Sequence, residues 1–382
     1  MKYRALLYPL LGLLALVLST SSTQAQNLVS FSVPGAGTVA STGTIPSAIN
    51  AKGTIIGVVI DNQFGEHGFV KPASSPAEVF DVPGSFDYGW TVPTAINDFG
   101  YITGYFANIA NCEAVNLQPL FVCYHAFIRN PNGTFVIFDA PDNTPPGFSD
   151  YIGIIPQGIN NSGVVTGWYF MRFTATELGF VRDANGKFTV LGGEGYEPNV
   201  VNDSGVVSGT ASLSPDSPYS SPYQGFIATR KGILKFTVPG TVAPYLNDEP
   251  NNVLINDFGV VAGDYYAQFS PATPASPIEH NVTAGFLRSA NGKFTTFASP
   301  GGPLMNLKVN AMNSSATTTG YFQDSTSPTR AFVRYDGGKF YILGLPSTSL
   351  YSLGTGINDK GVAVGWWQDT SGLYRGFIWQ KK

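Results

Sequence analysis

Residues 95–106 read AINDFGYITGYF, and the core of this stretch, INDFG, occurs again at residues 255–259. Weaker copies run along the chain. They read AINAKGTIIG from Ala48, GINNSGVVTG from Gly158, VVNDSGVVSG from Val200, AMNSSATTTG from Ala311 and GINDKGVAVG from Gly356. With the two INDFG segments this makes seven copies of one motif. A motif that recurs in this way indicates a repeat architecture.

The copies share three features that keep the same spacing. Each has an asparagine, and a second glycine follows it by seven residues. A first glycine follows by three residues in six copies, and Ala316 replaces it in the sixth. An aromatic tripeptide comes next, as HGF, HAF, LGF, QGF, AGF, RAF and RGF in chain order. The shared asparagines are Asn50, Asn97, Asn160, Asn202, Asn256, Asn313 and Asn358.

The pattern I-N-x-x-G predicts a β-hairpin. The isoleucine ends one strand on its buried face, and the asparagine can start a turn by hydrogen-bonding to its own backbone. The glycine takes the positive φ that would strain other residues. Valine or isoleucine then resumes the alternation of the next strand. Each repeat therefore contains one copy of the same turn.

The size of the repeat indicates the fold. Successive asparagines are 42 to 63 residues apart, which is room for four short strands. Units of this size are typical of β-propeller blades. We expect an all-β chain whose residues 26–382 form one domain, a seven-bladed β-propeller of four-stranded antiparallel blades.

The two ends of the repeat array look complementary. The last repeat stops after its tripeptide strand, in GLYRGFIWQKK, and so lacks a fourth strand. Near the N-terminus, NLVSFSVPG resembles that missing strand. We expect about residues 28–34, with Val29 to Val33 at their centre, to complete the last blade and close the ring. A solenoid is the competing architecture, but it gives no reason for complementary ends.

The first 25 residues are typical of a secretory signal peptide. Lys2 and Arg4 precede an apolar run at residues 6–18, and small residues lead to a cleavage point after Ala25. A membrane anchor is the alternative, but about 13 apolar residues are too few to span a bilayer comfortably. We expect a secreted protein, with the periplasm or the cell surface as alternative locations. We also expect no membrane span, and a monomer.

Composition narrows the class of partner. Only 12% of residues are charged, the formal net charge is −4, and lysine and arginine form no cluster. The basic footprint that nucleic-acid binding requires is therefore missing. Glycine and proline are abundant, at 44 and 27 residues, as expected for a β-protein with many tight turns.

The ordered motifs resemble a known family. The signature I-N-x-x-G-x-x-x-G followed by H-A-F is similar to the HAF family of bacterial extracellular repeat proteins. The literal tripeptide is His125, Ala126 and Phe127, with His67-Gly68-Phe69 as a near copy. The resemblance covers almost all of residues 26–382. It implies an exported bacterial repeat protein, and it brings no established activity and no catalytic residues.

Binding is expected on the face where the connections vary in length, because variable loops on a constant scaffold usually carry function. Aromatic pairs lie where the second strand enters that face. Their first members could stack on sugars, and the alternative is packing between neighbouring blades. The candidate ligand-binding residues are Tyr105, Trp168, Tyr265, Tyr321 and Trp366. Cys112 and Cys123 are expected to form a disulfide beside this face, with a catalytic thiol as the alternative.

Metal binding and catalysis have little support in the sequence. Asp61, Asp324 and Asp369 could ligate calcium, but a turn role fits them better because they lack the dense acidic spacing of a calcium loop. We predict no metal site, no catalytic residue and no cofactor, calcium being the one weak possibility. Four glutamates could supply a carboxylate pair, which the sequence cannot match up. They are Glu66, Glu113, Glu194 and Glu279.

We therefore expect a secreted, non-catalytic binding module whose ligand is a polysaccharide or an extracellular protein. The alternative is a propeller hydrolase or lyase that acts on an extracellular polysaccharide. A third possibility is a purely structural component of the cell envelope.

Overall fold

The computed structural model describes eleven segments of the chain. Within them the regular structure is all β-strand, and no helix is long and apolar enough to cross a membrane. The segment 1–26, Cys112 and Cys123, Asp324, Glu113 and Glu279 lie outside the described residues. The described segments are 27–86, 89–108, 124–141, 151–171, 176–212, 223–241, 252–270, 280–300, 306–323, 329–346 and 349–382.

The strands follow the sequence repeats. In the first repeat, β2 to β5 pair antiparallel in chain order. The bounds in the first three repeats are β2 (Gly43–Ile49), β3 (Ile55–Ile60), β4 (Glu66–Lys71), β5 (Glu78–Phe80), β6 (Thr91–Ile96), β7 (Ile102–Ala107), β8 (Tyr124–Arg129), β9 (Phe135–Phe138), β10 (Tyr151–Ile159), β11 (Val165–Met171), β12 (Thr176–Arg182) and β13 (Phe188–Glu194).

The later repeats are built in the same way. Their strands are β14 (Tyr196–Val201), β15 (Val207–Ser212), β16 (Tyr223–Thr229), β17 (Gly232–Phe236), β18 (Val253–Ile255), β19 (Val261–Ser270), β20 (His280–Arg288), β21 (Phe294–Phe297), β22 (Asn306–Met312), β23 (Thr318–Gln323), β24 (Arg330–Arg334), β25 (Phe340–Ile342), β26 (Ser349–Ile357), β27 (Ala363–Asp369) and β28 (Tyr374–Gln380). The first strand, β1 (Asn27–Phe31), pairs antiparallel with β28.

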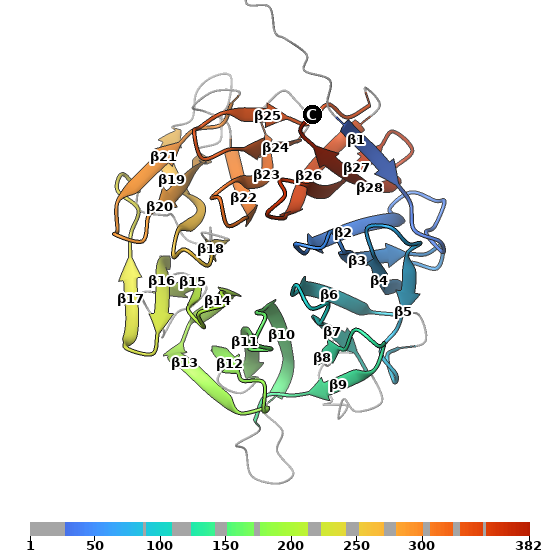
Figure 1. Ribbon diagram of the computed structural model, residues 1–382, viewed down its shortest axis with the longest axis horizontal. Helices are drawn as coiled ribbons and strands as arrows, with labels where there is room; N and C mark the ends of the chain where they lie inside the picture. Colours follow the sequence, from blue (N-terminus) through green and yellow to red (C-terminus); the bar gives the residue numbers. More distant parts are fainter. Residues whose placement is uncertain are drawn as a thin grey trace, which may run out of the picture.

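The sheets are arranged around a common centre, with the first strand of each repeat innermost (Figure 1). Three sheets have four strands each, namely β14–β17, β18–β21 and β22–β25. The remaining strands form two eight-stranded sheets, in which single parallel contacts join neighbouring repeats at Gly43–Tyr374 and Gly153–Tyr124. The all-β, largely four-stranded antiparallel prediction is thereby confirmed. The number of blades and the closure of the ring stay predictions.

The second glycine of each motif is explained by the phenylalanine of the tripeptide. Gly57 lies directly opposite Phe69 across β3 and β4, and Gly104 lies opposite Phe127. A Cβ atom on Gly104 would come within 2.8 Å of the Phe127 ring and 2.2 Å of the Val92 carbonyl oxygen. Only glycine fits there, so the glycine and the phenylalanine occur together. The same pairing is found in the other repeats, at Gly167–Phe180, Gly209–Phe226, Gly263–Phe286, Gly320–Phe332 and Gly365–Phe377.

Strand β1 takes the register of a fourth strand. In the first repeat the middle residue of the tripeptide, Gly68, lies opposite Phe80 of β5. In the last repeat the equivalent residue, Gly376, lies opposite Phe31 of β1. The N-terminal strand therefore supplies the last repeat with the aromatic ring that its own sequence lacks.

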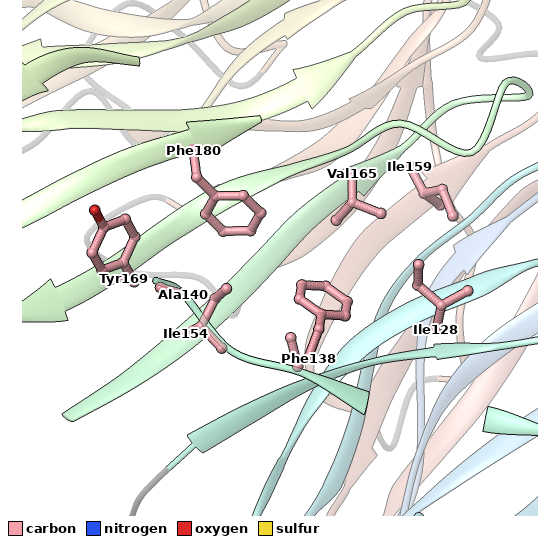
Figure 2. Close-up of a cluster of buried hydrophobic side chains, with 9 residues drawn as sticks. Ile128, Phe138, Ala140, Ile154, Ile159, Val165, Tyr169 and Phe180 are labelled. Carbon is pink, nitrogen blue, oxygen red and sulfur yellow. The ribbon is translucent and has the colours of Figure 1, made fainter. Parts of the chain in front are cut away.

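Apolar side chains fill the space between neighbouring repeats. Figure 2 shows one such cluster, in which Ile128 and Phe138 of one repeat meet Ile154, Val165 and Phe180 of the next. Ile154, Val165 and Phe180 have no measurable exposure. Burying side chains of this size stabilises the fold by about 1.5–3 kcal/mol each.

A bulge on the innermost strands adds polar contacts between repeats. In β2, β6, β10, β14, β22 and β26 the register shifts at the third residue before the motif asparagine. In the first, fourth, sixth and seventh repeats the side chain of the extra residue reaches the next repeat. Ser47 Oγ donates to the Pro93 carbonyl oxygen, and Thr355 Oγ1 donates to that of Pro46, each at 2.9 Å.

The first glycine of each motif adopts the expected left-handed conformation, as at Gly205 with φ +75°. Ala316 stands in this position in the sixth copy with φ +56°, so the turn persists there despite the Cβ. The space around Gly205 is open, with no atom within 4 Å of a Cβ built on it. Backbone conformation is therefore the requirement at this position.

We predict that Gly205→Ala lowers the free energy of unfolding by about 1 kcal/mol, since only the left-handed backbone opposes the methyl group. Gly337→Ala is the matched control: its surroundings are also open, and its φ lies outside the left-handed region. There alanine should raise the stability by about 0.5 kcal/mol. Urea titration measures both variants, and equal effects would contradict the conformational explanation.

Candidate functional site

The motif asparagines are buried, and each holds its own turn. The Oδ1 atom of Asn160 accepts hydrogen bonds from the backbone amides of Ser162 at 3.1 Å and Val164 at 2.9 Å. All seven asparagines accept a bond from the amide four residues later. This is the turn chemistry that the sequence predicts.

The other end of each asparagine amide reaches the neighbouring repeat. Asn50 Nδ2 donates to the carbonyl oxygen of Asn97 at 3.0 Å, and Asn97 Nδ2 donates to that of Asn160 at 2.9 Å. The bonds continue from Asn160 to Asn202, Asn256, Asn313 and Asn358. Asn358 Nδ2 then donates to the carbonyl oxygen of Asn50 at 3.1 Å. We call this set the asparagine cycle.

Acidic residues follow the asparagines and add a second set of bonds. Asp98 Oδ1 accepts from the backbone amide of Ala51 at 2.8 Å, and Asp203 Oδ1 accepts from that of Asn161 at 2.8 Å. Asp257 and Asp359 bond in the same way to the preceding repeats. Each carboxylate is thus held by a neighbour's backbone, which explains why Asp so often follows Asn in the motif.

These turns surround a cavity of about 200 Å³ at one end of the central axis. Each repeat contributes three consecutive residues to it, such as Ile96, Asn97 and Asp98. Within the described segments, no group of three or more His, Cys, Asp or Glu side chains has the geometry of a metal site. The polar groups at this end are engaged in joining repeats, and we assign the cavity a structural role.

The predicted aromatic residues lie further along the second strands, away from the asparagine turns. Tyr105, Trp168, Tyr321 and Trp366 are half-buried, and the ring that follows each of them is buried. The alternation expected along a strand therefore separates an inner ring from an outer one.

Two of the outer rings also contact aromatic neighbours in their own repeats. Tyr105 meets Tyr124 edge-to-face with ring centroids 5.1 Å apart, and Trp366 meets Tyr374 in the same way at 5.2 Å. Such pairs contribute about 0.5–1.5 kcal/mol. Packing thus buries part of each ring, and one edge of the ring stays partly exposed to solvent.

Tyr265 differs from the other four candidates. It lies nine residues after its asparagine, whereas the others lie eight residues after theirs. The equivalent residue in this repeat is Asp264, which is 1% exposed and lies 3.0 Å from the Lys308 amine. Burial raises the pKa of Asp264, and the charge of Lys308 opposes that effect. The one-residue displacement of Tyr265 is visible in the sequence, because Asp264 directly follows the second glycine, where the repeats of the other four candidates have the aromatic residue.

The histidines of the tripeptides fasten the third strand to the fourth. His67 Nδ1 lies 2.9 Å from Asp81 Oδ2, and His125 Nδ1 lies 2.7 Å from Asp139 Oδ1. In the fourth repeat Gln224 Nε2 donates to Thr237 Oγ1 at 2.9 Å in the same place. A His–Asp pair in two repeats and a Gln–Thr pair in a third thus make the same contact, in keeping with a structural role.

Two of the three candidate calcium ligands are turn-forming residues. Asp61 Oδ1 accepts from the backbone amides of Gln63 and Gly65, both at 2.8 Å, and Asp369 Oδ1 accepts in the same way from Ser371 and Leu373. Burial acts to raise the pKa of Asp61, but these two amides and His67 outweigh it and lower the pKa below the usual value. The third candidate, Asp324, lies outside the described residues.

Of the four glutamates considered for catalysis, Glu66 and Glu194 are described. Glu66 begins β4, and Glu194 ends β13 with an exposed side chain. Burial raises the pKa of Glu66. Burial, followed by the charges of Glu66 and Tyr124, raises the pKa of Tyr105 to about 12. Glu66 therefore belongs to a partly buried group with two tyrosines.

Comparison with solved structures identifies the fold as a β-propeller. A catalytically inactive virginiamycin B lyase from Staphylococcus aureus, solved with quinupristin, superposes with a TM-score of 0.52 and 11% identity, over 93% of this chain and 99% of the lyase. A streptogramin B lyase gives a TM-score of 0.53 and 12% identity, over 94% and 98%. A fucose-specific lectin from Aleuria aurantia is more distant, with a TM-score of 0.39. No known family model and no curated protein matches this sequence.

We predict that Asn202→Ala lowers the free energy of unfolding by about 2–4 kcal/mol, because it leaves the Val206 amide and the Asn256 carbonyl without their buried partner. Asp203→Ala, one residue away and exposed, should cost no more than about 1 kcal/mol. Urea titration compares the two. Equal losses would show that the asparagine does not join the repeats.

We predict that Glu66→Gln changes how stability depends on pH. The folded-state pKa of Glu66 is raised above its ordinary value of 4.5, so the native state binds the proton more tightly than the unfolded state does. Wild-type stability should therefore fall as the pH rises from 4.5 through the folded-state pKa, and the variant should lack this loss. The two proteins should be equally stable at pH 4, and the variant should be more stable at pH 7. A wild-type advantage at pH 7 would contradict this.

Proposed function

We propose that the chain is a secreted seven-bladed β-propeller that acts as a non-catalytic binding module, with an extracellular polysaccharide as its ligand. In this proposal residues 1–25 are the signal peptide, β1 closes the ring, and one chain folds alone as a monomer. The ligand binds on the face where the second strands end. An extracellular protein partner on the same face is the variant of this proposal that the experiment below separates.

Three observations support the closed ring. The asparagine cycle returns from Asn358 to Asn50, β1 pairs with β28 over five residues, and Phe31 occupies the place of a fourth-strand aromatic residue. Closure removes the unpaired edge strands of an open array, which would otherwise favour aggregation.

The binding proposal rests on the difference in burial within each aromatic pair, whose first ring is half-buried and whose second ring is buried. Tyr105, Trp168, Tyr321 and Trp366 keep part of their rings in solvent at equivalent points of four repeats, while the rings after them are fully used for packing. Partly exposed rings at repeated positions offer flat apolar surface with a polar edge. That combination suits a sugar chain. Tyr265, one position out of register, is the least favoured of the five candidates.

The alternative is a hydrolase or lyase acting on an extracellular polysaccharide. Its support is the partly buried Glu66, whose raised pKa and two tyrosine neighbours are typical of groups that exchange protons. The likeness to the two lyases concerns the fold and does not extend to the reaction.

The proposal predicts saturable binding of the purified mature protein to at least one member of a polysaccharide panel, detected by tryptophan fluorescence. Trp366→Ala or Trp168→Ala should weaken that binding at least tenfold, because stacking surface is lost, without unfolding the protein. Asp203→Ala, at the opposite end of the strands, is the control and should bind as the wild type does.

The same mixtures, incubated and analysed for shortened chains, separate binding from catalysis. Product that disappears in Glu66→Gln would establish the alternative. Absence of binding across the panel would contradict a polysaccharide ligand and leave an extracellular protein as the partner to test.

A further inference from the structure

One position in the repeat is occupied by glycine in three copies and by tryptophan in one. It lies seven residues before the motif asparagine, and it holds Gly43, Gly153 and Gly195 in the first, third and fourth repeats. In the second repeat it holds Trp90. Gly43, Gly195 and Trp90 have positive φ angles of +132°, +74° and +121°, whereas Gly153 does not, nor do Asn306 and Tyr351 at this position in the sixth and seventh repeats. A bulky residue in this region of backbone conformation is a rare and strained arrangement.

The backbone at this position joins two repeats. The amide of Trp90 donates to the Glu66 carbonyl oxygen at 2.7 Å, and the Trp90 carbonyl accepts from the Ala107 amide at 3.0 Å. Gly195 makes the equivalent two bonds, to Glu177 at 3.0 Å and from Ser212 at 2.8 Å. The same two bonds accompany a positive φ at Trp90 and at Gly195, so the tryptophan has a backbone conformation that glycine adopts without strain.

Packing of the Trp90 side chain does little to offset that strain. The Trp90 side chain is 36% exposed, and Trp90 belongs to none of the apolar clusters found among the described residues. At the equivalent position in the first repeat a side chain has no room, because a Cβ on Gly43 would lie 2.0 Å from the Tyr374 carbonyl oxygen. An exposed indole kept on a strained backbone indicates a role outside folding.

The neighbours of Trp90 are polar and aromatic. Glu66 is hydrogen-bonded to it through the backbone, and Ala107, its other partner, pairs directly with Tyr124. Tyr105 lies two residues before Ala107, and its ring meets that of Tyr124 at 5.1 Å. Glu66, Tyr105 and Tyr124 thus belong to the strand ends that hold the Trp90 backbone, at the junction of the first two repeats. No lysine or arginine takes part in these contacts.

We propose that Trp90, together with Glu66, Tyr105 and Tyr124, forms a subsite for one sugar ring of a neutral polysaccharide. The indole stacks on the apolar face of the sugar, and the carboxyl and phenol groups hydrogen-bond to its hydroxyls. This subsite rests on the proposed function and gives it a location and a ligand class. A carboxyl group with no basic partner in these contacts disfavours an acidic sugar, and it can accept hydrogen bonds from the hydroxyls of a neutral one.

The test is Trp90→Gly in the full-length mature protein, with Gly195 as the precedent for glycine in this backbone. Neutral polysaccharides that bind the wild type are titrated by isothermal calorimetry, and the melting temperature is measured in parallel. The variant should melt at or above the wild-type temperature, because the strain is removed. It should bind at least tenfold more weakly, because the ring is gone. Trp90→Phe keeps a ring and should retain most of the affinity.

The outcomes separate this inference from the function on which it rests. If the wild type binds and Trp90→Gly binds equally well, while Trp366→Ala does not bind, the subsite is wrong and the binding function stands. A Trp90→Gly protein that melts well below the wild type with unchanged affinity gives the indole a structural role and also overturns the subsite. If the wild type binds no neutral polysaccharide, the proposed ligand class fails, and the subsite fails with it.

Discussion

The whole arrangement depends on the side-chain amide of one buried asparagine in each repeat. Its oxygen accepts backbone amides of its own turn, and its nitrogen donates to the carbonyl oxygen of the next asparagine, as from Asn97 to Asn160. An aspartate would keep the acceptor and lose the donor, and a serine would be too short for both. Because buried polar groups need partners, one residue type satisfies the hairpin and the junction together. The same atoms thus set the local turn and the contact between neighbouring repeats.

The rest of the repeat follows outward from this residue at fixed distances. The second glycine admits the phenylalanine of the third strand, as Gly104 admits Phe127, and those phenylalanines are fully or almost fully buried. The bulge before the asparagine turns a side chain such as Ser47 toward the next repeat. One end of the structure is consequently committed to internal bonds. The other end carries the partly exposed rings and the connections of unequal length, and the proposed ligand binds there.

The sequence predicted what is local. The hairpin at Asn50, the antiparallel strands and the pairing of the N-terminal strand could all be inferred from spacing and turn chemistry. The bond from each asparagine to the next could not, because its partners are at least 42 residues apart and carry no local signal. The role of Trp90 could not be predicted from the sequence for a different reason. Its significance lies in a backbone angle, and this becomes visible only when Gly43 and Gly195 are seen in the same place.

Hydrogen exchange of the backbone amides that donate to the asparagine oxygens tests the central claim most directly. A closed ring has no end repeat to fray, so all seven amides should be protected to a similar degree, including those on either side of the junction between Asn358 and Asn50. The amides belong to Thr54, Tyr101, Val164, Val206, Val260, Thr317 and Val362. If Thr54 and Val362 exchanged orders of magnitude faster than Val206, the array would be open at that junction, and the asparagine cycle would not hold the fold together.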